Sequence, residues 1–221
     1  MDDFNTSTPL AAEQPVTPAA IPEILPEARL ADLPEKLRQG AALAGWNELL
    51  PVQARAIPYL FAQRDMMIQS RTGSGKTGAY LLPLLELLNP YLNQTQALIL
   101  VPTRELAVQV AKEAETISAQ SGLRAVAVYG GVGYRAQLDA FKAGAHIVIG
   151  TPGRILDHLL RRSLSLGALN YLIFDEADRM LSMGFYPDMR RVRGYLPEKP
   201  VSTYMFSATF PPQVLRLTDE F

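Results

Sequence analysis

The sequence contains no cysteine among its 221 residues. This absence excludes disulfide bonds and thiolate metal sites, and it fits a reducing cytoplasm, the location that we expect for the protein. Neither charge is in excess, because 21 basic residues stand against 22 acidic ones and give a net charge of −1. A balanced chain has no general electrostatic attraction for nucleic acid, so any such interaction must depend on local groups.

Long apolar runs are missing as well. No segment reaches the length needed to cross a membrane, and the N-terminus lacks the basic-then-apolar pattern of a signal peptide. We therefore expect no contact with a membrane. Hydrophobic residues still make up 48% of the chain and charged residues 19%, which is typical of a globular protein with a sizeable core.

Prolines are concentrated at the N-terminus, where five occur before residue 27. Because proline lacks an amide donor and breaks both helix and sheet, residues 1–29 are predicted to form a mobile extension. The rest of the chain, residues 30–221, is predicted to form one domain.

A glycine-rich segment at 70–77 lies between an apolar run of strand length and the apolar start of a helix. In such a turn the backbone N–H groups converge on phosphate oxygens, and the helix N-terminus adds its positive dipole. Lys76 can reach the phosphates and the Thr77 hydroxyl can bind Mg²⁺. Ser70 stands where the general pattern has glycine, but the flanking strand and helix favour a nucleotide site over a chance lysine in a turn. The predicted cofactor-binding residues of the loop are Arg71, Thr72, Gly73, Ser74, Gly75, Lys76 and Thr77.

Further short apolar runs, typical of strands buried on both faces, occur at 97–101, 125–129, 146–149, 171–174 and 202–206. Helical stretches lie between them, and this alternation predicts an α/β fold of three layers, a parallel sheet with helices on both faces. A polar or glycine-rich cluster follows each strand. The carboxyl ends of parallel strands meet at one edge of the sheet, so we expect these clusters to lie together. Pro83, in the helix after the phosphate loop, predicts a kink or an early end.

Two adjacent carboxylates, Asp175 and Glu176, end one of these strands. Phosphoryl transfer needs a carboxylate that holds Mg²⁺, partly through water, and a group that orients the attacking water. We assign the first role to Asp175 and the role of general base to Glu176. The alternative is an acidic helix N-terminus that complements the helix dipole, which the upstream phosphate loop disfavours.

Arg104, Thr151 and Arg154 stand at turns or helix starts, where a sugar-phosphate backbone can be bound. They could equally cap helices or form surface ion pairs, and the residues alone leave both interpretations open. The two histidines, His146 and His158, are far apart in the sequence and are expected to be structural. Core packing is also the expected role of the single aromatics Trp46, Tyr134 and Phe185.

Taken in order, the clusters resemble the motifs of DEAD-box RNA helicases: Ser70–Thr77, Pro102–Ala107, Gly130–Gly131, Thr151–Arg154, Asp175–Asp178 and Ser207–Thr209. The likeness covers residues 33–221 and is to the first of that family's two RecA-like domains. It implies ATP and Mg²⁺ as cofactors, with Lys76, Asp175 and Glu176 catalytic and Thr77 and Asp175 at the metal. It also implies that Asp178, with Ser207 and Thr209, couples the nucleotide state to RNA strand separation. The implied contacts to single-stranded RNA are Pro102, Thr103, Arg104, Glu105, Gly131, Thr151, Pro152, Gly153 and Arg154.

The resemblance also implies that Gln53 reads adenine, because a carboxamide can donate and accept hydrogen bonds at once. Two departures surround it. Leu49–Leu50 stands where the family has Pro-Thr, and Ala28 stands where the family has an aromatic that packs on adenine, with Leu30 the nearest larger apolar residue.

The family's second RecA-like domain, which supplies arginine fingers, is not among these 221 residues. We therefore expect a monomeric piece of a longer RNA-stimulated ATPase that binds nucleotide weakly and neither hydrolyses ATP well nor unwinds RNA alone. A helicase or translocase of the same superfamily acting on DNA is one alternative, disfavoured by the Asp-Glu-Ala-Asp sequence and Gln53. A nucleotide-gated RNA clamp that binds without unwinding is another, and the sequence does not separate it from a helicase.

Overall fold

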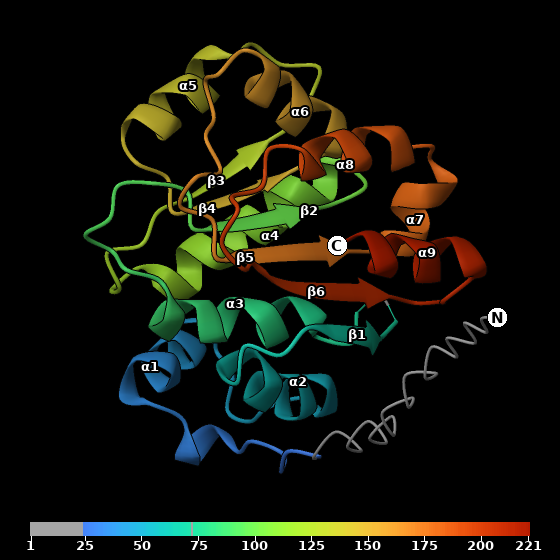
Figure 1. Ribbon diagram of the computed structural model, residues 1–221. Helices are drawn as coiled ribbons and strands as arrows, with labels where there is room; N and C mark the ends of the chain where they lie inside the picture. Colours follow the sequence, from blue (N-terminus) through green and yellow to red (C-terminus); the bar gives the residue numbers. More distant parts are fainter. Residues whose placement is uncertain (1–23, 72) are drawn as a thin grey trace, which may run out of the picture.

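Six parallel strands form the centre of the computed structural model, which describes residues 24–71 and 73–221 (Figure 1). Their order across the sheet is β1-β6-β5-β2-β4-β3, and every neighbouring pair is parallel, as predicted. The strands are β1 (Met66–Gln69), β2 (Ala97–Leu100), β3 (Ala125–Val128), β4 (Ile147–Gly150), β5 (Tyr171–Asp175) and β6 (Ser202–Ser207).

Helices connect the strands and cover both faces of the sheet (Figure 1). A 3₁₀ turn at Leu30–Asp32 precedes the first of them. The α-helices are α1 (Glu35–Leu43), α2 (Pro51–Phe61), α3 (Lys76–Leu87), α4 (Arg104–Ser118), α5 (Arg135–Lys142), α6 (Pro152–Leu160), α7 (Ala177–Ser182), α8 (Tyr186–Arg193) and α9 (Pro212–Glu220).

Alternate residues of the strands point to opposite faces and build two separate cores. On one face Ile99 and Ile173 pack in a cluster with α1, α2, α3 and α4. On the other face Leu98 and Leu172 join a cluster formed with α6, α7, α8 and α9. The predicted three-layer arrangement is therefore confirmed, with the sheet as its middle layer.

One expectation was wrong. The run at 125–129 was expected to be buried on both faces, but β3 is an edge strand and three of its four residues are partly exposed. Pro83 was expected to kink the helix after the phosphate loop or to end it early; α3 does not end there but continues to Leu87, with Pro83 buried.

The first described residues lie against α2. The Leu25 amide donates to the Tyr59 hydroxyl at 3.1 Å, and the Ala28 amide donates to the Ala54 carbonyl at 2.8 Å. These contacts begin upstream of the boundary predicted at residue 30, whereas residues 1–23 lie outside the described part of the chain. Within that part, no helix combines the length and apolarity needed to cross a bilayer.

Both histidines have structural partners. His146 Nδ1 accepts a hydrogen bond from the Arg124 amide at 2.9 Å and links β4 to the start of β3. His158 Nε2 lies 2.8 Å from Gln137 Oε1, and its Nδ1 lies 2.8 Å from Ser163 Oγ. Across residues 24–71 and 73–221, no group of three metal-ligating side chains that includes a histidine is present.

Replacing His146 with Asn should flatten the pH dependence of stability. Burial, with a smaller effect of the Arg124 charge, lowers the pKa of His146. The folded protein therefore favours the neutral ring over the charged one. The stability that this preference contributes is fully present above the unfolded-state pKa of about 6.5. It is lost as the pH falls toward and through the lower pKa of the folded protein. The Asn oxygen can still accept from the Arg124 amide, but it does not titrate.

Urea unfolding at pH 7.5, 6.5 and 5.5 measures the effect. The wild type should lose stability below pH 6.5, and the variant should lose less, by at most about 1.4 kcal/mol per pH unit for one proton. Parallel profiles for the two proteins would contradict the assignment.

Candidate functional site

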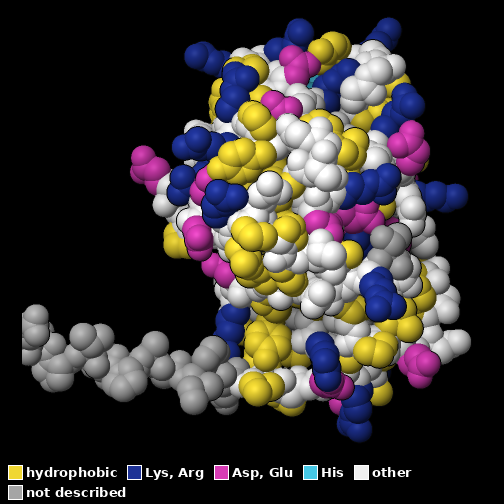
Figure 2. All heavy atoms as spheres, turned by 90° about the vertical axis from the view of Figure 1, so that its right-hand side faces the viewer, with side chains coloured by type: hydrophobic (Ala, Val, Ile, Leu, Met, Phe, Trp, Pro, Cys, Tyr) yellow, Lys and Arg dark blue, Asp and Glu magenta, His cyan; other side chains and the backbone are white. Residues whose placement is uncertain are grey.

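The strand order sorts the predicted motifs into two groups along the carboxyl edge of the sheet. The adjacent strands β1, β6 and β5 lead into the glycine-rich loop, Ser207–Thr209 and Asp175–Asp178. The adjacent strands β2, β4 and β3 lead into the segments that begin at Val101, Thr151 and Tyr129. Seen from this edge, acidic and basic side chains are intermixed and form no single charged surface (Figure 2).

The glycine-rich loop lies between β1 and α3, as predicted. Gly73 and Gly75 have φ values of 79° and 84°, in the left-handed region that glycine adopts without steric cost. A Cβ atom at Gly75 would lie 2.3 Å from Leu50 Cδ1, so a side chain here would have to displace the end of Leu50 besides adopting an unfavourable φ. Arg71 is exposed and its carbonyl accepts from the Ser74 amide at 3.2 Å, whereas Thr72 lies outside the described residues.

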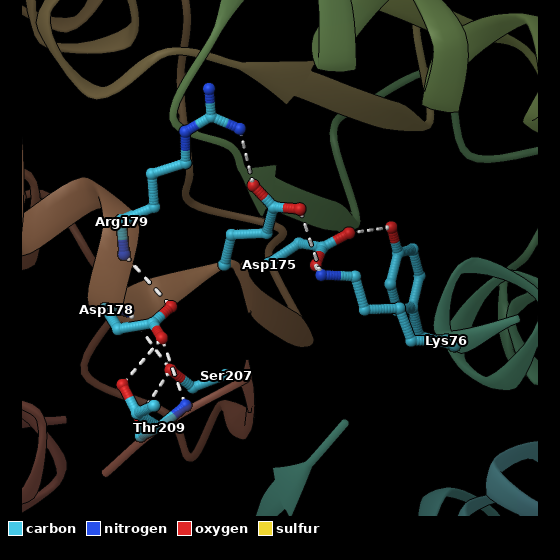
Figure 3. A network of polar contacts seen from close by, with 8 residues as sticks. Lys76, Asp175, Asp178, Arg179, Ser207 and Thr209 are labelled. Atoms are coloured by element: carbon cyan, nitrogen blue, oxygen red, sulfur yellow. Dashed lines mark hydrogen bonds and ion pairs between the residues drawn. The ribbon is translucent and has the colours of Figure 1, made fainter. Parts of the chain in front are cut away.

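Lys76, at the start of α3, is buried and bound to both predicted carboxylates (Figure 3). Its ammonium nitrogen lies 2.7 Å from Asp175 Oδ1 and 3.4 Å from Glu176 Oε1. Burial raises the pKa of Asp175, and the neighbouring Lys76 charge opposes that rise. The structure thus brings the three residues predicted to be catalytic into one charged cluster, in which Asp175 is fully buried while Lys76 and Glu176 line a surface pocket.

A fourth member of the cluster, Tyr80, was not predicted. Its buried hydroxyl donates to Asp175 Oδ2 at 2.8 Å. Burial and the negative charge of Asp175 raise the pKa of Tyr80 well above its ordinary value. A hydrogen bond with Thr77 opposes this rise without cancelling it. The available signal was a tyrosine one helical turn after Lys76, in an otherwise apolar stretch.

Thr77 and Asp175, the two predicted metal ligands, both interact with the Tyr80 hydroxyl. Hydroxyl and carboxylate oxygens are the hard donors that Mg²⁺ prefers, and Mg²⁺ commonly takes only one or two protein ligands beside phosphates and water. No cluster of three acidic or histidine ligands occurs in the described residues. The donor set therefore fits an ion that arrives with a nucleotide.

Glu176 adopts an unusual backbone conformation, with φ 58° and ψ 52° directly before α7. Non-glycine residues in this left-handed region are uncommon, and they cluster at functional sites. The turn directs one carboxylate oxygen to Lys76 and the other to Arg179 Nη1, at 3.3 Å.

The predicted coupling residues are also in direct contact (Figure 3). Asp178 Oδ2 accepts from the Thr209 amide at 3.0 Å and from its hydroxyl at 2.8 Å, and the Asp178 amide donates to Ser207 Oγ at 3.1 Å. Burial alone would raise the pKa of Asp178, but the hydrogen bonds with Thr209 and Ser207 outweigh it and lower that pKa. The Ser207 carbonyl in turn accepts from the Ser70 amide at 2.9 Å, so the same strand end contacts the glycine-rich loop.

Gln53 lies under that loop. Its Oε1 accepts from the Leu50 amide at 2.9 Å and its Nε2 donates to the Gly75 carbonyl at 3.0 Å, and only 2% of the residue is exposed. Both ends of the carboxamide therefore have protein partners. Trp46 lines a small hollow beside Gln53 and packs so close to Gly78 that a Cβ there would lie 2.6 Å from the indole.

At the other half of the edge, Arg104 and Gly131 come together. Gly131 has φ 82°, and a Cβ built on it would lie 3.4 Å from Arg104 Nη1. Arg104, Glu105 and Gly131 are exposed, whereas Thr103, Thr151, Gly153 and Arg154 are partly buried. The Thr103 side chain caps α4 by accepting from the Leu106 amide at 3.2 Å.

The prolines of these segments have buried side chains. For Pro102 and Pro152, both predicted to contact RNA, such a contact would have to be made by the backbone. Pro152 occupies the first turn of α6, where its fixed φ suits the helix. N–H groups in the first turn have no acceptor within the helix, so the missing N–H of proline costs no hydrogen bond there. The two prolines therefore shape the turns and offer RNA no side-chain surface. Tyr134 stacks against two arginines and Phe185 packs against the core, so neither is a free base-stacking platform.

The family model described as "DEAD/DEAH box helicase" matches residues 50–217. The chain is 48% identical over 178 residues to the ATP-dependent RNA helicase DeaD of Escherichia coli strain K12, covering 80% of this chain and 28% of that protein. It is 40% identical over 212 residues to the ATP-dependent RNA helicase vasa of Drosophila melanogaster, covering 93% of this chain and 32% of that protein.

A solved structure agrees in fold. The crystal structure of a DEAD box protein from the hyperthermophile Methanococcus jannaschii matches with a TM-score of 0.80 and 40% identity, covering 85% of this chain and 51% of that chain. This likeness confirms the predicted RecA-like fold. The chain spans about a third or less of the length of both relatives.

Replacing Tyr80 with Phe should destabilise the domain, because it removes the hydroxyl bound to Asp175 and leaves a buried carboxylate oxygen without that donor. A buried group left unsatisfied costs about 1–3 kcal/mol. Urea unfolding at pH 7 measures the loss. Tyr204→Phe is a matched control, since the Tyr204 hydroxyl donates to the Leu60 carbonyl over a longer 3.4 Å and should cost less. Equal losses in both variants would contradict a specific Tyr80–Asp175 contribution.

Proposed function

Because this chain belongs to the DEAD/DEAH box helicase family, we propose that it is the ATP-binding domain of an ATP-dependent RNA helicase. The observation that carries the proposal is the convergence of Lys76, Asp175 and Glu176, from the glycine-rich loop and the end of β5, in one buried cluster. Such a helicase couples ATP hydrolysis to local unwinding of RNA, and the relatives carry the name of that activity.

Binding of ATP exchanges partners of Lys76. Its ammonium group is held by two carboxylates, and the phosphates of a nucleotide offer a competing set of negative oxygens. With Lys76 turned to the phosphates, Asp175 would hold the metal and Glu176 would orient the attacking water. Mg²⁺, when bound, neutralises charge on the phosphates and orients them.

The coupling to RNA runs through β6. Ser207 contacts the glycine-rich loop through its carbonyl and Asp178 through its hydroxyl, so a shift of either motif changes the hydrogen bonds of the other. Thr209 adds two further hydrogen bonds to Asp178. We assign the transfer of the nucleotide state to this trio.

RNA is bound by its backbone on the half of the edge formed by β2, β4 and β3. Exposed Arg104 lies beside Gly131, and Thr151 follows the neighbouring strand. These groups are suited to contacts with phosphates and sugars and do not recognise base edges. The binding is therefore independent of the RNA sequence. A second RecA-like domain of the same longer protein completes the site, and the 221-residue chain is monomeric and cytoplasmic in this proposal.

Two other functions are separable by experiment. A DNA translocase would bind DNA and RNA oligomers equally, whereas this proposal expects a preference for RNA in competition. A nucleotide-gated RNA clamp would bind RNA in the presence of ATP without displacing a strand. Strand displacement by the longer protein decides between that clamp and a helicase.

Nucleotide choice tests the role of Gln53. We expect the chain to bind Mg-ATP more tightly than Mg-GTP and Gln53→Ala to lose that preference. Gln53→Glu is a second variant: it keeps an acceptor for the Leu50 amide but replaces the donor to the Gly75 carbonyl with a negatively charged oxygen, so it should also lose the preference for ATP. Titration of fluorescent nucleotides measures both affinities. Equal weakening of ATP and GTP would mean that Gln53 braces the loop and does not read adenine.

Turnover tests the need for a second domain. The 221-residue chain should release phosphate from ATP slowly and without stimulation by RNA, since an arginine supplied by another domain is worth factors of about 10³ or more. The longer protein should be stimulated, and Glu176→Gln in it should abolish the stimulation while ATP still binds. RNA-stimulated turnover by the short chain alone would refute this part of the proposal.

A further inference from the structure

Arg154, in the first turn of α6, uses its guanidinium group inside the protein. The group lies over the ring of Tyr134, with 4.3 Å from Cζ to the ring centroid. Nη2 donates to the Val132 carbonyl at 3.0 Å, and Nη1 donates to Gln137 Oε1 at 3.3 Å. One face and both terminal nitrogens of the side chain are therefore engaged with the loop after β3 and with α5.

Gln137 is held in place from beneath. The residue is 4% exposed, its Nε2 donates to the Tyr129 carbonyl at 3.2 Å, and its Oε1 also lies 2.8 Å from His158 Nε2. Because Gln137 Nε2 is the donor to Tyr129, its Oε1 is the acceptor that Arg154 meets. The orientation of the amide is thus fixed by contacts at both ends.

Tyr134 is fixed in a similar way. Arg161 lies on the same ring, with 4.6 Å from Cζ to the centroid, and the Tyr134 hydroxyl donates to Asp157. Arg161 Nε donates to the other oxygen of Asp157 at 2.8 Å. A ring that contacts two guanidinium groups stabilises both through cation–π attraction and restrains their movement.

Arg104 provides the contrast. Its side chain is 55% exposed, and its Nε lies 3.4 Å from Oε1 of the adjacent Glu105 in a weak surface pair. Its guanidinium approaches Gly131, in the same loop whose Val132 carbonyl is held by Arg154. The two arginines therefore meet one loop, Arg104 with a side chain that is more than half exposed and Arg154 with one that is partly buried.

We infer that Arg154 is a positioning residue, which holds the loop at 130–133 in place through Val132, and that Tyr134 and Gln137 hold Arg154. RNA phosphates are then met by Arg104 and by the backbone of Gly131. The inference rests on the proposed RNA binding of this edge and changes the role of Arg154 within it, from a direct contact to a support.

Salt dependence separates the two roles. Each cation that neutralises a phosphate of single-stranded nucleic acid contributes about 0.7 to the slope of log Kd against log salt concentration. With the 221-residue chain, Mg-ATP and a labelled oligouridylate, Arg104→Ala should weaken binding and lower that slope by about 0.7. Arg154→Ala should weaken binding about tenfold, the size of one charge-assisted hydrogen bond, and leave the slope unchanged. A lower slope for Arg154→Ala would overturn the inference.

Neutral substitutions test the support itself. Tyr134→Leu and Gln137→Leu keep every arginine and should weaken RNA binding several-fold with the wild-type slope. Tyr134→Phe keeps the ring beneath Arg154 and should stay close to wild type. If Tyr134→Leu and Gln137→Leu bind RNA as the wild type does, the supporting role is wrong.

Amide hydrogen exchange in the protein without RNA tests whether Arg154 holds the loop, whether or not the proposed RNA binding is correct. The Leu138 amide, which donates to the Tyr134 carbonyl at 2.9 Å, should exchange about tenfold faster in Arg154→Ala and in Tyr134→Leu, with unchanged exchange in β5 as the control for global unfolding. Unchanged exchange of the Leu138 amide would refute the positioning role. Failure of the wild type to bind RNA would refute the proposed function, and the exchange rates would still decide whether Arg154 holds the loop.

Discussion

The buried ion pair between Lys76 and Asp175 is the contact on which the site depends. Two charges removed from water cost several kcal/mol each unless they are paired and hydrogen-bonded, and here Glu176 and Tyr80 complete the pairing. The partners come from α3 and from the end of β5, so the pair also fixes the glycine-rich loop against the carboxylates. Because both partners that the described residues offer Lys76 are negative oxygens, the lysine can exchange them for phosphate oxygens without being left unpaired.

Strand order explains why so few contacts suffice to couple the motifs. β6 lies between β1 and β5, and its last residue, Ser207, pairs with Gln69 at the end of β1. The motif after β6 therefore touches both the glycine-rich loop and Asp178. On the far side of β5 come β2, β4 and β3, whose loops are assigned to RNA, so β5 borders both halves of the edge.

The sequence predicted most of the sheet, because apolar runs of four or five residues leave few alternatives when turn residues separate them. It did not predict α7, α8 and α9, which are short and mostly polar and are held by packing against the sheet. The edge position of β3 was also hidden, since Ala125–Val128 is as apolar as a central strand. Residue types singled out Lys76, Asp175 and Glu176, which the fold brings into contact, but Tyr80 acts through one hydroxyl that no periodicity reveals.

Arg104 and Arg154 show where prediction from residue type ends. Both are arginines at the start of a helix that follows a strand, and both were assigned to RNA on equal grounds. The difference between them comes from residues distant in sequence, since Tyr134 and Gln137 of the preceding connection fill the space around Arg154, while the Arg104 side chain is left more than half exposed. An arginine that stacks on a ring and donates to a carbonyl has few N–H donors free to bind a ligand. An exposed arginine keeps its donors available to solvent or phosphate. The chemistry of a charged residue in a motif is therefore set by which of its donors the fold has already used.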